Sequence, residues 1–387
     1  MPQPVYLDHA ATTPVRREVF EAMEPFFGPR FGNPSSVHRW GREARAALDE
    51  ARERVARCIG AQPDEVCFTS GGTEADNLAV LGPLRSQMAK GRTAIVSTPI
   101  EHKAVLATVH HAAQLGATER MLGVTSSGIV DLNAIGTAID DSVAVCTVMW
   151  VNNEIGTIQP VPEIAERVKA HGGVMHTDAV QAFGKVDFSV KNVPVDLLTI
   201  SGHKIGAPKG IGAVYIRRGT KIDPMFHGGS QERVRRPGTE NVASAVALAC
   251  AAELAIAEKD AECARLTTLR DSLEEGLLAK IPDAVIHGRG APRASHIVNI
   301  SVPGTDSESL LMALDLAGVA ASSGSACQSG SVTPSHVLSA MRVRPELAVA
   351  AIRMSLGSLT TPEGIARVVE LFPALIAKAR RLSGIAS

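Results

Sequence analysis

The sequence predicts an α/β protein with two domains, a large one with a mostly parallel sheet covered by helices and a smaller α+β one. Short apolar runs alternate with helical stretches between residues 66 and 216, which is typical of a parallel sheet with helices on both faces. The pattern changes after Lys259, and 387 residues exceed the ~100–200 that one domain usually contains. We therefore expect a large domain over residues 13–258 and a small domain made of residues 1–12 and 259–387.

Six apolar runs rich in β-branched side chains are the expected strands of the large sheet. They span residues 66–68, 94–96, 143–150, 174–176, 195–200 and 213–216. Apolar residues at every third or fourth position indicate a helix before the first strand, at 44–59, and helix-like stretches lie between most of the strands, as at 162–171. In the small domain, the leucine spacing over 266–277 predicts a helix, 296–302 a strand, and 365–376 the last helix.

Charge and composition exclude several classes of partner. Lys plus Arg number 39 and Asp plus Glu number 40, so neither nucleic acid nor an anionic membrane is expected. The N-terminus lacks the features of a secretory signal, and the most apolar helical stretch, 243–257, is shorter than the ~20 residues that span a bilayer. The six cysteines show no CxxC spacing, which argues against disulfides and metal sites and favours a cytoplasmic location.

Lys204 and Asp178 each follow an apolar strand, and they lie 26 residues apart in the chain. Ligands of open α/β sheets bind at the carboxyl ends of the strands, so both side chains are expected at the ligand edge. Lys204 could form a Schiff base there, and Asp178 could pair with a cationic ring nitrogen of a cofactor. The alternatives are a solvated turn lysine and a helix-capping aspartate.

Two further loops stand between a strand and a helix. Gly72 and Thr73 combine a glycine turn with a hydroxyl at a helix start, which suits an anion, although an ordinary helix cap is the alternative. This turn is neither a P-loop nor a GxGxxG pattern. His102 could lie against an aromatic cofactor and transfer protons near neutral pH, or it could be a surface histidine.

Cys327 and Arg353 are the candidate reactive groups of the small domain. Cys327 lies in the Gly/Ser-rich run 322–331, where a thiolate is expected to be accessible to a substrate. The other five cysteines lie on expected strands and helices and are interpreted as packing residues. Arg353 is set in an apolar run, so it is either paired structurally or placed to bind a substrate carboxylate.

Together these residues resemble the cysteine desulfurases of the NifS/IscS type, which are fold-type I, class V pyridoxal-phosphate enzymes. The resemblance extends almost from end to end, and some phrases, such as residues 148–150 and 318–322, are closer to NifS. Its segments are residues 6–14, 31–36, 69–74, 101–105, 151–156, 176–181, 201–204, 236–241 and 322–327.

The resemblance implies a pyridoxal 5′-phosphate cofactor and assigns the residues around it. Lys204 matches the lysine that binds the cofactor covalently, Asp178 the partner of its pyridine nitrogen, and His102 the histidine stacked on its ring. The other matches are Asn153 and Gln181 near the phenolic oxygen, Gly72, Thr73, Ser201 and His203 at the phosphate, and Thr239, supplied to the phosphate by the second subunit of a homodimer.

The implied reaction removes sulfur from L-cysteine and leaves L-alanine and a persulfide on the enzyme. Asn33, Asn153 and Arg353 match the binders of the substrate, the first and last of them at its carboxylate, and Cys327 matches the thiolate that receives the sulfur. Attack of a thiolate at sulfur is the same displacement as in thiol–disulfide exchange. The persulfide is expected to supply an acceptor protein for iron–sulfur cluster assembly or other sulfur biosynthesis.

Two departures from the family pattern concern the acceptor and the thiol. Gln328 follows the cysteine where relatives usually have threonine, which affects the loop rather than the nucleophile. The chain ends at Ser387 without the aromatic tail of IscS-like members, so docking of a NifU/IscU-like scaffold is in doubt.

Other functions remain open from the sequence alone. A selenocysteine lyase, a cysteine-sulfinate desulfinase or a class V aminotransferase could use the same scaffold, although an aminotransferase has no use for Cys327. A sulfur carrier with a vestigial cofactor pocket is the alternative from another class, and the presence of Lys204, Asp178 and His102 argues against it.

Overall fold

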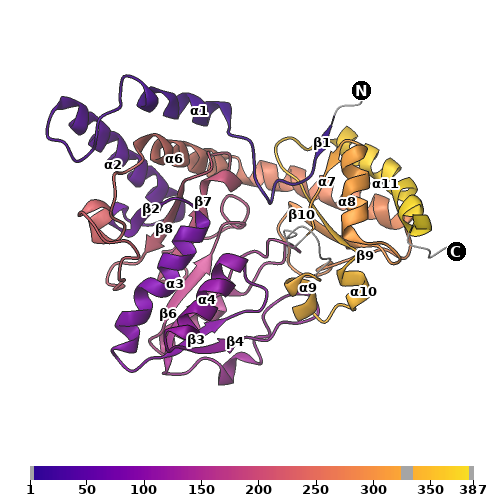
Figure 1. Cartoon of the computed structure of the whole chain (residues 1–387), viewed down its shortest axis with the longest axis horizontal. Helices are drawn as coiled ribbons and strands as arrows, with labels where there is room; N and C mark the ends of the chain where they lie inside the picture. Colours follow the sequence, from indigo (N-terminus) through magenta and orange to yellow (C-terminus); the bar gives the residue numbers. More distant parts are fainter. Residues whose placement is uncertain (1–3, 324–333, 383–387) are drawn as a thin grey trace.

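The computed structural model describes residues 4–323 and 334–382. Figure 1 shows two lobes, one around the largest sheet and one formed by the C-terminal part of the chain together with the N-terminal strand. Within the described residues the largest sheet has seven strands, in the spatial order β2 (Val66–Thr69), β8 (Gly212–Ile216), β7 (Leu197–Ser201), β6 (Val174–Asp178), β5 (Val143–Thr147), β3 (Ala94–Ser97) and β4 (Thr118–Met121).

This sheet is parallel except for β8, which runs antiparallel to both β2 and β7. The predicted α/β class is therefore confirmed, and six predicted strands lie within it. The run 143–150 ends as a strand at Thr147; beyond it the Val148 and Trp150 N–H groups still donate to His176 O and Asp178 O of β6, while the Met149 N–H donates to the carboxylate of Glu101. The edge strand β4 was not predicted, because its Thr-Glu-Arg-Met sequence is largely polar and no residue of it is fully buried.

The helices around this sheet are α1 (Arg17–Met23), α2 (Arg39–Ile59), α3 (Gly72–Met88), α4 (Lys103–Gln114), α5 (Val161–Ala170) and α6 (Val242–Ala257). Helix α2 buries the predicted apolar stripe, including Leu48 and Val55, and ends at Gly60 in a left-handed conformation that favours glycine. Helix α6 is apolar nearly all round and packs against α1 and α2, which explains why it is buried.

The smaller lobe has two small sheets and its own apolar core. Its strands are β1 (Val5–Tyr6), β9 (Val285–Ile286), β10 (Ile297–Ser301), β11 (Val319–Ala320) and β12 (Ala351–Ser355), and its helices are α7 (Lys259–Lys280), α8 (Ser307–Leu316), α9 (His336–Ala340), α10 (Pro345–Ala348) and α11 (Pro362–Leu382). Strand β10 lies between β9 and β12, while β1 pairs in parallel with β11. The predicted strand 296–302 and the helices at 266–277 and 365–376 are all present.

Short 3₁₀ helices connect several of these elements, namely η1 (Glu24–Phe27), η2 (Pro63–Glu65), η3 (Ile135–Thr137), η4 (Gly202–Lys204) and η5 (Gln231–Val234). In the described part of the chain, no helix combines the length and the apolarity that crossing a membrane requires.

Candidate active site

A cavity of about 320 Å³ lies at the carboxyl ends of β6 and β7, where the two lobes meet. Both lobes line it, the smaller one with Arg353 of β12 and with Ser322 and Ser323. The predicted site residues that line it are Gly72, Thr73, His102, Asn153, Asp178, Gln181, Ser201, His203, Lys204 and Arg353. Residues that are up to 281 positions apart in the sequence, from Gly72 to Arg353, thus face one space, which is the arrangement expected of a ligand site.

Lys204 ends the 3₁₀ helix η4, and its amine crosses to the N-terminal segment. The Nζ atom donates hydrogen bonds to the backbone oxygens of Ala10 and Ala11, both at 2.7 Å. Burial lowers the pKa of Lys204 to about 8, and the positive charges of Arg353 and Lys185 add to this effect. A substantial fraction of the amine is therefore neutral near neutral pH, as a lysine nucleophile or base requires.

Asp178 is the last residue of β6 and is almost completely buried. Its Oδ1 accepts a hydrogen bond from the Val180 N–H at 2.8 Å. Burial raises the pKa of Asp178, against the opposing influence of His102 and Lys204. A buried carboxyl group of this kind is stabilised as an anion only by a cation or further donors, and a protonated ring nitrogen supplies both.

His102 precedes α4 and acts as its N-cap. Its Nδ1 accepts a hydrogen bond from the Ala104 N–H at 3.1 Å, so the proton of the neutral ring is assigned to Nε2. Desolvation by the surrounding protein lowers the pKa of His102, and this effect outweighs the attraction of Asp178. The ring therefore lines the cavity as a neutral imidazole.

The part of the cavity lining around the start of α3 is suited to an anion. Helix α3 begins at Gly72, after Gly71 with φ 153° and ψ −175°, a conformation essentially restricted to glycine. The helix start presents backbone N–H groups beside the hydroxyls of Thr73 and Ser201. Burial lowers the pKa of His203 to about 4, so this ring is neutral as well.

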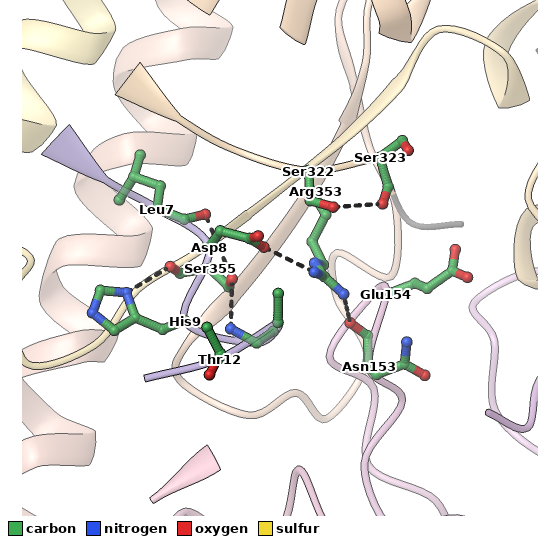
Figure 2. A network of polar contacts seen from close by, with 12 residues as sticks. Leu7, Asp8, His9, Thr12, Asn153, Glu154, Ser322, Ser323, Arg353 and Ser355 are labelled. Atoms are coloured by element: carbon green, nitrogen blue, oxygen red, sulfur yellow. Dashed lines mark hydrogen bonds and ion pairs between the residues drawn. The ribbon is translucent and has the colours of Figure 1, made fainter. Parts of the chain in front are cut away.

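Arg353 is only partly satisfied, as Figure 2 shows. Its two terminal nitrogens donate to Asn153 O at 3.0 Å and to Asp8 Oδ1 at 2.9 Å. Its Nε is buried and has no partner among the described residues. An arginine that borders a cavity with an unused donor is placed to accept a further anionic group.

Sequence reasoning missed several polar groups that line this cavity or contact its lining residues. Asp8 holds Arg353, and Asp76, buried with no hydrogen bond to its Oδ1 among the described residues, lies 3.7 Å from His176 Nε2. Glu154 accepts a hydrogen bond from the Ser335 hydroxyl. Asp8 and Glu154 belong to segments that resemble the family, but no spacing rule distinguishes these three acids from ordinary loop and helix acids.

Three predicted residues are not part of this cavity. Asn33 Oδ1 accepts the Ser35 N–H at 2.9 Å in an outer loop, and Thr239 lines a separate cavity of about 280 Å³. Cys327 lies outside the described residues. The described residue Ser322 exchanges backbone hydrogen bonds of 2.7 and 3.1 Å with Arg353.

The other cysteines are placed as predicted. Cys67 and Cys146 are buried on β2 and β5, and burial raises the pKa of both thiols. Cys58 is partly buried on α2, and burial raises its pKa to about 11. Such thiols are protonated and poorly reactive, which agrees with their interpretation as packing residues.

The residues of the cavity fit pyridoxal phosphate chemically. A lysine amine, a buried carboxyl group, a neutral histidine and an anion-binding helix start are the groups that would hold the aldehyde, the ring nitrogen, the ring face and the phosphate. The buried carboxyl of Asp178 makes no ion pair with the described residues, and a protonated ring nitrogen would supply one.

Comparisons with known proteins agree with this chemistry. The family model described as aminotransferase class V matches residues 5–368. A cysteine desulfurase IscS of Dictyoglomus turgidum is 46% identical over 99% of this chain and 97% of its own length. The cysteine desulfurase NifS of Azotobacter vinelandii is 44% identical over 98% and 94%. A solved structure titled NifS-like protein has a TM-score of 0.91 and 35% identity, covering 97% of this chain and all of the other.

Proposed function

The chain belongs to the class V aminotransferase family, within which it is a cysteine desulfurase of the IscS/NifS type, and we propose on this premise how its cavity performs the reaction. The observation that carries the proposal is the single cavity that Lys204, Asp178 and Arg353 share. These three side chains can bind an aldehyde, a ring nitrogen and a carboxylate, which are the groups that a pyridoxal-phosphate enzyme acting on an amino acid must hold.

Pyridoxal phosphate, when bound, supplies an electron-withdrawing ring that stabilises negative charge next to the amino group of the substrate. Lys204 would hold its aldehyde, Asp178 its ring nitrogen, and His102 its ring face. Gly72, Thr73, Ser201 and His203 would bind the phosphate, and Asn153 and Gln181 would lie near the phenolic oxygen. The lowered pKa of Lys204 lets the released amine accept the α-proton of the substrate near neutral pH.

The substrate end is formed by Arg353, with Asn153 beside it. The guanidinium would bind the carboxylate of L-cysteine through its planar fork, and Asn33 is proposed as a second binder. The thiolate of Cys327 would then form a bond to the substrate sulfur while the bond from that sulfur to the β-carbon breaks. The substrate carbon leaves as a carbanion and takes a proton, so that L-alanine and a persulfide on Cys327 result.

The second subunit is proposed to complete the site. Apolar side chains are unusually exposed in the N-terminal helices and loops, with Phe27 and Phe31 each 70% exposed and Val37 88% exposed. A homodimer would cover such a surface. Thr239, which lines its own cavity beside Ser70, would contact the phosphate bound by the partner subunit.

We also propose how the chain divides into domains and where its sulfur goes. Residues 13–258 would form the cofactor-binding domain and residues 1–12 with 259–387 the smaller one, which the separate apolar core around β10 and α11 supports. The sulfur would pass to an acceptor protein of iron–sulfur cluster assembly, such as a NifU/IscU-like scaffold, in the cytoplasm.

The proposed function is tested by incubating the protein with pyridoxal phosphate and L-cysteine and measuring alanine and sulfide. Wild-type protein is expected to produce both. The variant Lys204→Ala should lose covalent cofactor attachment and alanine production, while Cys327→Ala should lose sulfide release and retain the visible absorbance of the bound cofactor. The matched control Cys250→Ala should behave as wild type.

A protein that stays colourless with added cofactor would contradict the proposal, and it would favour a sulfur carrier without catalysis. Normal sulfide release by Cys327→Ala in the presence of dithiothreitol would remove this thiol from the mechanism. Faster release of selenide from selenocysteine than of sulfide from cysteine would identify a selenocysteine lyase instead.

A further inference from the structure

Gln181 connects the two lobes at the edge of the cavity. It follows β6 by three residues, and its side-chain Nε2 donates a hydrogen bond to Ala10 O at 3.0 Å. Its Oε1 lies 3.1 Å from Nε2 of His296, the residue immediately before β10 of the smaller lobe. His296 is only 1% exposed, so this contact is shielded from water.

The two partners determine the orientation of the amide. A backbone oxygen can only accept a hydrogen bond, so the amide nitrogen of Gln181 must face Ala10. Its oxygen then faces His296, and the contact is satisfied only when His296 carries a proton on Nε2. Burial, assisted by the nearby charges of Lys185 and Arg353, lowers the pKa of His296 well below its ordinary value, so the ring is neutral and this proton is its single one.

The remaining N–H of the Gln181 amide has a defined direction as a result. One hydrogen of Nε2 is used by Ala10, and Gln181 also lines the cavity. A reversed amide would place two acceptors, the amide oxygen and Ala10 O, against each other, and it would leave the His296 N–H facing another donor. Both neighbours therefore select the orientation in which the cavity receives a donor rather than an acceptor.

We infer that His296 is a positioning residue that holds the Gln181 amide so that its N–H is directed at the phenolic oxygen of the cofactor. This inference rests on the proposed function, because it requires pyridoxal phosphate in the cavity. A donor at this place stabilises the deprotonated phenolic oxygen, because a hydrogen bond to an ionised acceptor is stronger than one to a neutral acceptor. His296 thus acts on the cofactor through Gln181 without touching it.

His296 shares its scaffold with the substrate-binding arginine. The backbone oxygen of His296 accepts the Leu356 N–H at 2.8 Å, and Asn299 of β10 pairs with Arg353 of β12. The same pair of strands therefore carries the group expected to bind the substrate carboxylate and the group that orients Gln181. A displacement of this strand pair would alter both contacts together.

The inference is tested on the holoenzyme by titrating the visible absorbance of the bound cofactor with pH. In His296→Leu the Gln181 amide loses one of its two anchors, and the proton affinity of the chromophore is expected to rise by roughly tenfold. His296→Gln, whose amide can place a donor where Nε2 was, should restore most of the wild-type titration. Asparagine also carries an amide, but its side chain is shorter and cannot place a donor where Nε2 was. His296→Asn should therefore titrate like His296→Leu.

Action through Gln181 is tested by repeating His296→Gln and His296→Asn in a Gln181→Ala background. There the two variants should titrate identically, because the group that His296 positions is gone. If His296→Gln and His296→Asn both titrate like wild type in protein that retains Gln181, the inference is overturned while the proposed function stays intact. Failure of the wild-type protein to bind the cofactor at all would instead overturn the proposed function. A difference between the variants that persists in Gln181→Ala would also overturn the inference, since His296 would then act by another route.

Nitrogen-15 NMR of the histidine rings provides a readout without activity. The protein labelled at histidine is expected to show a neutral His296 with its proton on Nε2, identified by the loss of that signal in His296→Gln. A proton on Nδ1 would contradict the hydrogen bond to Gln181 from which the inference begins.

Discussion

Arg52 and Arg353 are both about 5% exposed, but they bind their carboxylate partners differently. Arg52 of α2 makes a two-pronged ion pair with Glu232, at 2.6 and 2.7 Å, and donates to Val66 O as well. Arg353 touches one carboxylate oxygen of Asp8 and one backbone oxygen, and its Nε is unpaired among the described residues. The difference indicates that Arg52 stabilises the fold, whereas Arg353 is arranged to bind something more.

The surroundings of the two arginines support the same distinction. Glu232 also accepts the Phe68 N–H, and Arg52 lies 4.9 Å from the centre of the Phe68 ring, so both members of the pair have further partners within the fold. Arg353 instead borders the cavity that contains Lys204. Substitutions at Arg52 and at Arg353 should therefore separate stability from catalysis.

Substitution Arg52→Leu should lower the free energy of unfolding by about 3–5 kcal/mol, because it leaves Glu232 charged and buried without its partner. Urea denaturation followed by circular dichroism measures this change. The double variant Arg52→Leu/Glu232→Leu should recover part of the loss, though not all, because the Phe68 N–H is then unpaired. A loss below ~1 kcal/mol in the single variant would show that the enclosed pair is not structural.

Substitution Arg353→Lys should reduce kcat/KM for L-cysteine about 100-fold while changing the free energy of unfolding by less than ~1 kcal/mol. Lysine keeps the positive charge next to Asp8 but cannot grip a carboxylate with a planar fork. Steady-state kinetics and denaturation on the same preparation separate the two effects. If Arg353→Lys lowered the free energy of unfolding as much as Arg52→Leu does, the distinction between the two arginines would be lost.

The turn that carries Glu232 is strained, and its strain can be relieved. Glu232, Arg233 and Val234 have φ values of 47°, 57° and 67°, and this left-handed region is least favourable for the β-branched valine. Val234→Gly should therefore raise the free energy of unfolding by about 1 kcal/mol. Val234→Ala is the matched control, since alanine also avoids this region. An equal gain from alanine would show that side-chain exposure rather than backbone strain is responsible.

The smallest effect is expected from the influence of the Arg353 charge on the pKa of Lys204. The charge of Arg353 contributes to lowering the pKa of Lys204 to about 8, so Arg353→Met should raise that pKa. Only the neutral amine attacks an aldehyde, and its fraction increases as the pH rises through the pKa. Incorporation of pyridoxal phosphate into apoprotein should therefore be roughly threefold slower at pH 7 in Arg353→Met and recover at higher pH. An unchanged pH profile would show that the charge of Arg353 does not affect the pKa of Lys204.

Much of this arrangement could be predicted from the sequence, because it depends on local patterns. Apolar β-branched runs located six strands of the main sheet, and the parallel-sheet rule placed Lys204 and Asp178 at one edge. The ion pair of Arg52 could not be predicted, because its partner lies 180 residues away in the chain. The left-handed turn at Glu232 was likewise invisible, since no glycine or asparagine occupies it and tertiary contacts hold it.

The roles of neighbouring acids show the same limit. Asp178 was identified because it ends a strand, whereas Asp8 and Asp76 lie in a loop and a helix, where acids are common. Their importance depends on Arg353 and His176, which reach them only after the sheet and the two lobes have formed. For Cys327, Asn33 and Thr239, the proposed roles remain predictions.

The N-terminal segment that receives the Lys204 amine also has a consequence for biosynthesis. Ala10 donates its N–H to Ser355 Oγ, Ser355 donates its N–H to Leu7 O, and the His9 N–H donates to Ser355 O, so the N-terminal segment is held against β12. A ribosome delivers Ser355 more than 340 residues after Ala10, and until then the first residues lack their partners. Nascent chains stalled before β12 should therefore be unable to retain pyridoxal phosphate. Assembly of the cavity around Lys204 then becomes one of the last events of synthesis.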